Sequence, residues 1–268
     1  MIPLVILDLD GTMIGSSGQV SADVWAAVDA ARADGIKLAA CTGRPGLGIA
    51  LRAAKRLGPT NAHVFQSGAH LAYPDGETLQ ASSLREAAAL KLVQHARDLG
   101  LVLELYTPHH LYVERKTPMS VAHEKLLGVP ALVRDLSEVV TSEPVIRAQW
   151  VLREDQEEAA AAVAVSDVTV SRATSPGLPD SVFVSLTRAG VSKGSAVRDL
   201  VAHLKVPIEH VMAVGDTTGD LPMLELVGHP VVMGNAQAAL KERFERVVGD
   251  VDDGGVIEAL ELARRLRP

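Results

Sequence analysis

The sequence predicts an α/β protein with a doubly wound, Rossmann-like parallel-sheet core and an inserted α+β cap domain. Residues 3–7 form an uninterrupted apolar run, which is typical of a strand buried on both faces of a parallel sheet. Strands and helices alternate near both ends of the chain, whereas paired strands lie beside helices in the middle. We therefore expect a core domain of residues 1–80 and 187–268 and a cap domain of residues 81–186.

Local signals define the elements of the core. After the strand at 3–7, a glycine-rich, hairpin-like excursion at 11–20 leads to a helix of residues 22–34, capped by Ser21 and stopped at Gly35. A second buried strand covers residues 36–41. Further elements follow the same alternation: a helix, a strand, a short hairpin turning at 74–76, and, after the insertion, strands near 211–214 and 230–233 with helices between and after them.

The inserted segment has a different order of elements. We expect helix 83–99, strands 101–106 and 110–115, helix 118–127, strand 145–152, helix 154–164, and strands 167–172 and 181–186. Strands that pair with their neighbours beside helices indicate an α+β domain.

Composition excludes several classes of protein. Of the 268 residues, 47% are hydrophobic, which suffices for a large core in about two domains. The single cysteine rules out an internal disulfide framework, and a net charge of −7 without a Lys/Arg stripe argues against nucleic-acid binding. No apolar stretch reaches the length of a signal or membrane span. We expect a cytoplasmic protein that binds no membrane; no pattern indicates its oligomeric state.

Two acidic residues follow the first strand, at the end where open α/β sheets bind ligands. Asp8 and Asp10 are two residues apart, so extended geometry would place both carboxylates on one side. Converging carboxylates repel each other unless a cation lies between them, and Mg²⁺ prefers such oxygen ligands. We expect Asp8, Asp10 and Asp216 to bind Mg²⁺, and Asp220 to support these ligands without contacting the metal itself. The single cysteine and the spacing of the nine histidines argue against zinc.

A hydroxyl and a lysine complete a candidate phosphate site. Thr42 follows strand 36–41, so its hydroxyl and the nearby backbone N–H groups lie at the same end of the sheet. Lys193 falls in the first turn of a predicted helix with Ser192 as N-cap, where its charge opposes the helix dipole unless an anion binds there. Four strings together predict a magnesium-dependent phosphoryl-transfer site: ILDLDGT (6–12), CTGR (41–44), VSKG (191–194) and VGDTTGD (214–220).

These strings resemble the motifs of the haloacid dehalogenase-like hydrolases, and among them the Cof-type phosphatases, whose cap lies between the second and third motifs. The resemblance covers the whole chain. DLDGT at 8–12 resembles motif one, Thr42-Gly43-Arg44 motif two, Lys193-Gly194 motif three and residues 215–220 motif four, and VMGNA at 232–236 is similar to a further signature that contains Asn235. Gly219 departs from the pattern, since the family usually has a phosphate-holding asparagine there.

The resemblance implies a phosphatase with an aspartyl-phosphate intermediate. Asp8 is then the nucleophile and Asp10 the general acid and base. The metal, Lys193 and Thr42 would neutralise the transferred phosphoryl group. The implied substrates are small phosphate esters such as sugar phosphates, pyridoxal phosphate, flavin mononucleotide or phosphoglycerate-like compounds. The expected substrate contacts are Gly43, Arg44 and Asn235, and the cap offers the cations Arg115, Lys116, His123, Arg147 and Arg172 for a second anionic group.

Two alternatives remain open. A phosphotransferase or phosphomutase would pass the phosphoryl group to an alcohol instead of water, and a non-catalytic protein would hold a phosphorylated ligand without turnover. A thiolate nucleophile at Cys41 is disfavoured. That mechanism needs an arginine six positions later, where Leu47 stands, so we expect Cys41 to be a small buried residue.

Overall fold

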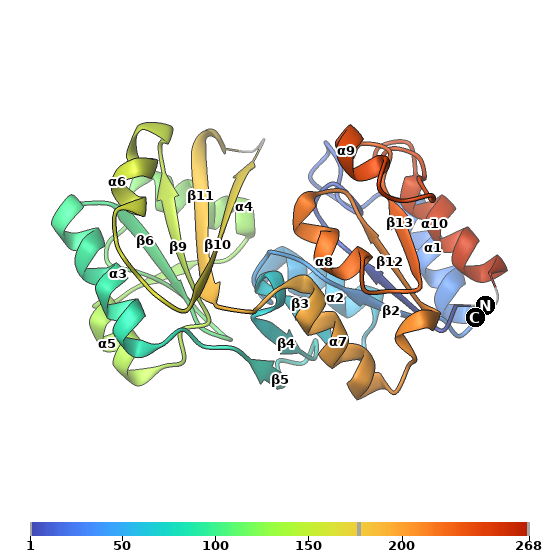
Figure 1. Cartoon of the computed structure of the whole chain (residues 1–268), viewed down its shortest axis with the longest axis horizontal. Helices are drawn as coiled ribbons and strands as arrows, with labels where there is room; N and C mark the ends of the chain where they lie inside the picture. Colours follow the sequence, from blue (N-terminus) through green and yellow to red (C-terminus); the bar gives the residue numbers. More distant parts are fainter. Residues whose placement is uncertain (1, 176–177, 267–268) are drawn as a thin grey trace. The chain divides into compact units, whose positions relative to one another are not determined.

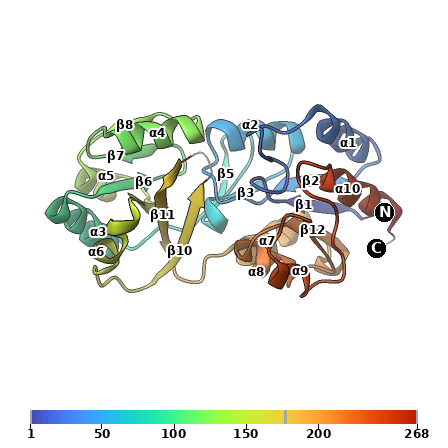
Figure 2. The same ribbon diagram turned by 90° about the horizontal axis from the view of Figure 1, so that it is seen from above.

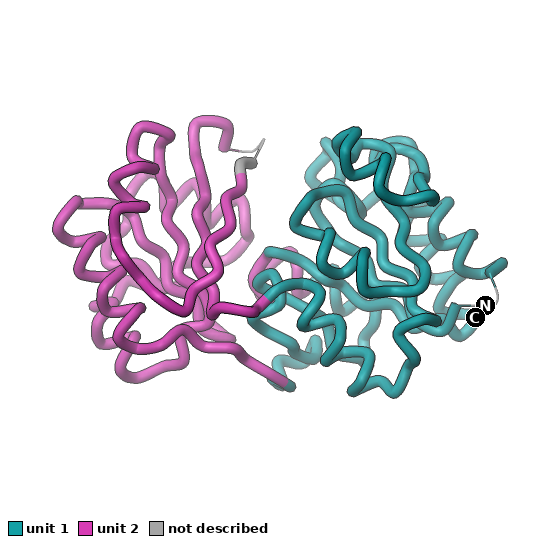
Figure 3. The backbone as a smooth tube through the Cα atoms, viewed as in Figure 1, with its two compact units in different colours: residues 1–43, 52–79, 192–268 teal, residues 44–51, 80–191 magenta. Residues whose placement is uncertain are grey.

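The computed structural model describes residues 2–175 and 178–266, which divide into two compact units (Figures 1 and 3). Unit 1 comprises residues 1–43, 52–79 and 192–268, and unit 2 comprises residues 44–51 and 80–191. Each unit has its own sheet and its own hydrophobic core. Within the described part of the chain, every helix is too short or too polar to cross a membrane.

A parallel sheet in the order β13-β12-β1-β2 forms the centre of unit 1. Its strands are β1 (Leu4–Leu7), β2 (Lys37–Ala40), β12 (Val211–Gly215) and β13 (His229–Val232). Leu7 lies opposite Val214 on one side and Ala40 on the other. All four side chains of β1 are buried, as the apolar run predicts. Because β1 lies between β2 and β12, the carboxyl ends of these three strands meet at the edge where such sheets bind ligands.

Helices cover both faces of this sheet, which confirms the doubly wound core (Figure 2). On one face α1 (Ala22–Ala33) packs with α10 (Gly255–Arg265), and on the other α7 (Lys193–Leu204) packs with α8 (Leu221–Leu224). The Ser21 side chain accepts a hydrogen bond from Val24 N and caps α1, as predicted. The other helical segments of unit 1 are α9 (Ala238–Lys241), η1 (Gln66–Gly68), η3 (Ile208–His210) and η4 (Thr218–Asp220). The helix α2 (Gly48–Leu57) begins in unit 2 and ends in unit 1.

A small second sheet follows β2 in the order β3-β4-β5, with β3 (His63–Phe65), β4 (His70–Ala72) and β5 (Thr78–Ala81). A parallel bridge between Cys41 and Val64 joins β3 to the end of β2. The hairpin turn at 74–76 forms as predicted. The hairpin-like excursion at 11–20 is different: a bridge between Asp10 and Ile14 closes a tight turn, and no strand pair is assigned to its described residues.

Unit 2 contains a mixed sheet in the order β10-β11-β9-β6-β7-β8. The strands are β6 (Val102–Tyr106), β7 (Leu111–Val113), β8 (Ala131–Val133), β9 (Arg147–Leu152), β10 (Val168–Ser175) and β11 (Leu178–Arg188). The helices α3 (Glu86–Leu99), α5 (Leu136–Ser142) and α6 (Glu157–Ala161) bury one face of this sheet. In Figure 2, α4 (Pro118–Leu127) lies on the other side of the sheet from α3 and α6.

Two predictions for unit 2 were wrong. The helix expected at 154–164 is a 3₁₀ turn, η2 (Glu154–Gln156), followed by the short α6. It ends early because Val163 and Val165, two residues apart, both pack on the core, and that spacing does not fit one helix face. The sequence reading also missed β8 and α5.

Folding stability should depend on pH through His63. Its buried ring accepts a hydrogen bond at Nδ1 from Ala40 N (3.0 Å) and donates from Nε2 to Gly58 O (2.8 Å). Burial lowers the pKa of His63 from 6.5 to about 4. The unfolded chain therefore takes up a proton near pH 6.5, whereas the folded protein does so only near pH 4. Stability should fall by about 3 kcal/mol as pH drops through this window.

Urea unfolding of the wild type and His63→Asn near pH 7.5, 5.5 and 4.5 isolates this effect. Asparagine keeps a polar group near Ala40 N but cannot titrate, so the difference in unfolding free energy between the two proteins should shrink as pH falls. A difference that stays constant across the range would contradict the assignment.

Candidate active site

The strand order of unit 1 brings three predicted residues together. Asp8 directly follows β1 and Asp216 directly follows β12, whereas one residue separates Thr42 from the end of β2. Asp8 N donates to Val214 O at 3.0 Å, so the parallel pairing continues into the loop that carries Asp8. Asp8 and Thr42 are buried and Asp216 is half-buried. Their side chains therefore start from one edge of the sheet.

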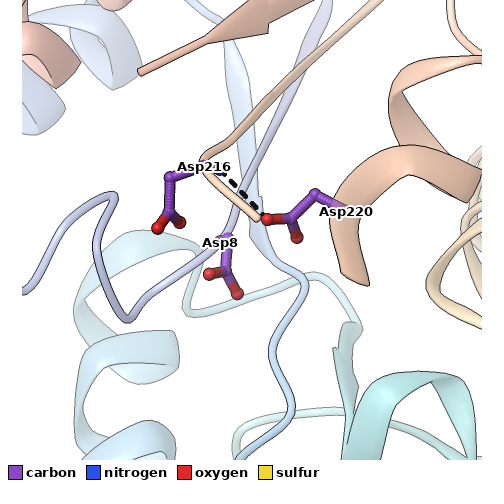
Figure 4. Close-up of side chains that lie close together, drawn as sticks. All are labelled: Asp8, Asp216 and Asp220. Carbon is purple, nitrogen blue, oxygen red and sulfur yellow. Dashed lines mark hydrogen bonds between the residues drawn. The ribbon is translucent and has the colours of Figure 1, made fainter. Parts of the chain in front are cut away.

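Three carboxylates form a compact cluster at this edge. Asp8, Asp216 and Asp220 each offer an oxygen atom within 4.8 Å of the others, and Figure 4 shows the three side chains converging. Burial raises the pKa of Asp8 well above its usual value; the nearby Lys193 opposes this rise, and Asp220, Asp216 and Asp10 add to it. Carboxylate oxygens in this arrangement suit a hard divalent cation.

Lys193 is the cation that the structure places against this cluster. Its side chain is 8% exposed, and its ammonium group donates to Asp8 Oδ1 at 2.7 Å and to Asp220 Oδ1 at 2.5 Å. Burial opposes the charge on Lys193, but Asp220 and Asp8 outweigh it and hold the pKa of Lys193 well above its usual value. Lys193 therefore stays protonated and fixes one oxygen of Asp8.

The start of α7 carries Lys193 as the sequence predicts. Ser192 Oγ accepts from Ser195 N at 3.1 Å, and Ser195 Oγ accepts from Ser192 N at 3.0 Å, which closes a capping box. Gly194 allows this helix end to approach α8 closely, because a Cβ there would lie 2.3 Å from Pro222 O. Lys193 therefore lies where the N-terminal ends of α7 and α8 pack together.

Both oxygens of Asp220 already have partners. Oδ1 accepts from Lys193, while Oδ2 accepts from Asp216 N (3.1 Å), Thr217 N (3.0 Å) and Thr217 Oγ1 (3.1 Å). The dashed line in Figure 4 marks the contact with Asp216 N. Asp220 is fully buried and lies at the end of η4. These bonds shape the loop after β12 and orient Lys193, while the support of a bound metal ion by Asp220 stays a prediction.

The sequence reading missed the role of Thr12. Its buried hydroxyl donates to Asp216 Oδ1 at 3.1 Å. Gly11, with φ +79°, makes room for the same carboxylate, because a Cβ there would lie 2.2 Å from Asp216 Oδ2. Burial and the charge of Asp220 raise the pKa of Asp216 to about 6, against the hydrogen bond from Thr12. The string DLDGT contains both residues, but only the strand order shows that they touch Asp216.

The remaining predicted residues lie close to this edge in sequence or in space. Asp10 is exposed on the turn after Asp8 and is not a member of the three-carboxylate cluster. Asn235 donates to Gly11 O at 2.8 Å and accepts from Val251 N at 3.0 Å, so it ties two loops together. Arg44 belongs to unit 2, where it donates to Leu126 O at 3.3 Å. Metal or substrate contacts of these residues stay predictions.

Four of the five candidate cations of the cap have partners within unit 2. His123 Nδ1 lies 2.9 Å from a buried Glu104 oxygen, and the Arg147 guanidinium lies 4.0 Å from the ring centre of Tyr106. Lys116 pairs with Glu124 and Arg172 with Glu157, while Arg115 is exposed. A substrate contact from any of the four paired cations would compete with these interactions.

Cys41 is not placed to act as a nucleophile. Its side chain is fully buried in the core of unit 1, and burial raises the pKa of its thiol well above the usual range. A thiolate needs the opposite environment, partly exposed and electropositive. The geometry therefore favours the carboxylate of Asp8 over this thiol.

Comparisons with known proteins agree with the motifs. The family model for haloacid dehalogenase-like hydrolases matches residues 5–260. The chain is 28% identical to the candidate phosphatase M6_Spy0533 of Streptococcus pyogenes serotype M6 (97% of each chain) and 25% identical to phosphatase YwpJ of Bacillus subtilis (96% of this chain, 98% of the relative). The solved structure of the subclass IIB sugar phosphatase BT4131 matches with a TM-score of 0.79 at 20% identity, covering 97% of this chain and 98% of that one.

The family model spans nearly the whole chain, and the insertion lies between the second and third motifs. The chain therefore belongs to the haloacid dehalogenase-like hydrolases, in their Cof-type branch.

Proposed function

We propose that this hydrolase is a Mg²⁺-dependent phosphatase that cleaves a small phosphorylated metabolite, a sugar phosphate or similar phosphomonoester, through an aspartyl-phosphate on Asp8. The contact of the Lys193 ammonium with Asp8, beside the cluster with Asp216, carries this proposal. It supports the proposal because, in this scheme, the ammonium that binds the phosphate oxygens lies beside the proposed nucleophile and the proposed cation site. The names of M6_Spy0533, YwpJ and BT4131 support phosphatase activity, and the last supports the sugar-phosphate class.

The acidic residues fit a divalent cation. Asp8 and Asp216 would hold Mg²⁺ through their carboxylates, with Asp10, from the same turn as Asp8, as the third proposed ligand through its backbone carbonyl oxygen, which leaves its carboxyl group available for proton transfer. Three clustered carboxylates face one ammonium, so the metal-free site carries excess negative charge. When bound, Mg²⁺ would supply positive charge to the phosphate oxygens and let a dianionic ester approach these carboxylates.

The residues of the chain divide the chemistry between them. The Asp8 oxygen that Lys193 does not hold attacks phosphorus, the new O–P bond forms, and the bond to the leaving alkoxide breaks. Asp10, exposed above the sheet edge, gives its proton to the alkoxide and then takes one from the attacking water. Attack by that water releases phosphate and restores Asp8. Lys193 and Thr42 neutralise charge on the phosphoryl oxygens throughout.

Loss of either acidic residue after β1 should stop turnover in different ways. Asp8→Asn removes the nucleophile and should lower kcat for an aryl phosphate by at least about 10³-fold. Asp10→Asn removes only proton transfer and should cost about 10²–10⁴-fold. Because an aryl leaving group needs little protonation, the Asp10 variant should lose more activity with a sugar phosphate. Phosphate release measured with excess Mg²⁺ tests both, and an active Asp8 variant would refute the mechanism.

Asp216→Asn should stabilise the metal-free protein and weaken its response to Mg²⁺. The raised pKa of Asp216 means that its charge is held unfavourably above about pH 6. Without that charge, unfolding in a chelator near pH 7.5 should require about 1–3 kcal/mol more. The Mg²⁺-induced rise in Tm should need about tenfold more metal. Asp180→Asn, which changes an exposed carboxylate of β11, is the control and should alter neither quantity.

The acceptor of the phosphoryl group distinguishes hydrolysis from the alternatives. A screen of phosphorylated metabolites without added alcohol should release inorganic phosphate, and the best substrates should be sugar phosphates. Turnover only after an alcohol acceptor is added would indicate a phosphotransferase or phosphomutase. Tight binding without any turnover would indicate a phospho-ligand-binding protein.

A further inference from the structure

The turn after β3 has an unusual backbone. Gln66, Ser67 and Gly68 follow one another with φ values of +55°, +54° and +106°. Left-handed conformations are rare for residues other than glycine, asparagine and aspartate, and two such residues in succession are strained. Strain of this kind persists only where the surroundings fix the backbone, and it concentrates at functional sites.

One side of this turn holds the backbone of Thr42. Ser67 N donates to Thr42 O at 3.0 Å, and Thr42 N donates to Val64 O at 2.9 Å, so residues 64–67 bind both backbone groups of Thr42. The Ser67 hydroxyl also lies over the next residue: a Cβ placed on Gly43 would lie 3.3 Å from Ser67 Oγ. With this left-handed backbone, the Ser67 N–H group points toward the carbonyl oxygen of Thr42.

The other side of the turn lies against the helix that carries Lys193. A Cβ placed on Gly68 would lie 2.2 Å from Ser192 O and 3.3 Å from the Cβ of Ala196. The turn backbone therefore touches the N-cap residue that precedes Lys193. Any residue larger than glycine at position 68 must push the turn and the start of α7 apart.

We propose that the turn of residues 66–68 is a positioning element that fixes the spacing between the Thr42–Gly43 loop and Lys193. The inference rests on the proposed function, in which both groups bind the phosphoryl oxygens. The turn itself contacts no substrate in this scheme. The turn fixes their spacing because the Thr42–Gly43 loop and the start of α7, which are far apart in sequence, both contact it. Its strained backbone is what allows the turn to contact both elements.

Two glycine variants with the same backbone strain test the proposal. Gly68→Ala and Gly76→Ala both place a methyl group on a backbone with φ of +106° and +105°, but outside the adjoining residues no described heavy atom lies within 4 Å of a Cβ on Gly76. Backbone strain should cost both variants similar stability, and Gly68→Ala should lose further stability because its methyl group meets Ser192 O. Only Gly68→Ala should weaken binding of inorganic phosphate to the Mg²⁺-loaded protein, by at least about tenfold in calorimetry. Equal phosphate affinity in the two folded variants would overturn the proposal.

A second pair of variants applies if Gly68→Ala does not fold. A Cβ on Gly43 would have one heavy atom within 4 Å among the described residues other than its chain neighbours, and that atom is Ser67 Oγ. Gly43→Ala should weaken phosphate binding because its methyl group presses on Ser67. Adding Ser67→Gly removes that contact and should recover at least about threefold of the lost affinity. No recovery in the double variant would overturn the proposal.

Measurements on the wild type separate this inference from the proposed function. A wild type that neither binds phosphate nor hydrolyses a phosphate ester would refute the proposed function itself. A wild type that does both, with Gly68→Ala indistinguishable from Gly76→Ala, would leave the phosphatase intact and refute only the role of the turn. Affinity for Mg²⁺ should change less than twofold in every variant, because Asp8 and Asp216 are untouched.

Discussion

The contact of one buried ammonium with two carboxylates is the interaction on which the candidate site depends. Lys193 binds Asp8 and Asp220 at 2.7 and 2.5 Å and thereby orients the predicted nucleophile. It cannot balance the cluster alone, because Asp216 lies there as well. Buried charge that lacks a partner is costly, so the metal-free site gives up stability. Three carboxylates and one ammonium leave two negative charges, which a bound divalent cation would balance.

The sheet topology explains how residues on both sides of a long insertion form this cluster. Asp8 precedes unit 2 in the sequence, and Lys193, Asp216 and Asp220 follow it. The pairing of β12 beside β1 places Val214 opposite Leu7, so the next residues of both strands emerge together. Asp220 then folds back on the loop after β12 and reaches Lys193. The insertion leaves this geometry intact because unit 2 buries a core of its own.

Sequence patterns predicted the features that depend on chain-local physics. The buried strand at β1, the caps Ser21 and Ser192, and the helix of residues 118–127 all follow from apolar runs and capping side chains. Contacts between residues that follow different strands, such as Thr12 with Asp216, could not be predicted from the sequence, because they depend on the order of the strands in the sheet. The turn at 66–68 was equally hidden, because glutamine and serine carry no local signal for a left-handed backbone.

The places where the chain passes between the two units bear on the site directly. One crossing lies at residues 43 and 44, next to Thr42, and another at 191 and 192, next to Lys193. Two further crossings lie within secondary-structure elements, at 51 and 52 in α2 and at 79 and 80 in β5. The first two crossings are therefore adjacent in sequence to the two predicted phosphate-binding residues. The turn of residues 66–68 hydrogen-bonds to Thr42 and lies against Ser192, so in its proposed role it fixes the backbone beside both of these crossings, which gives a physical reason for its strained conformation.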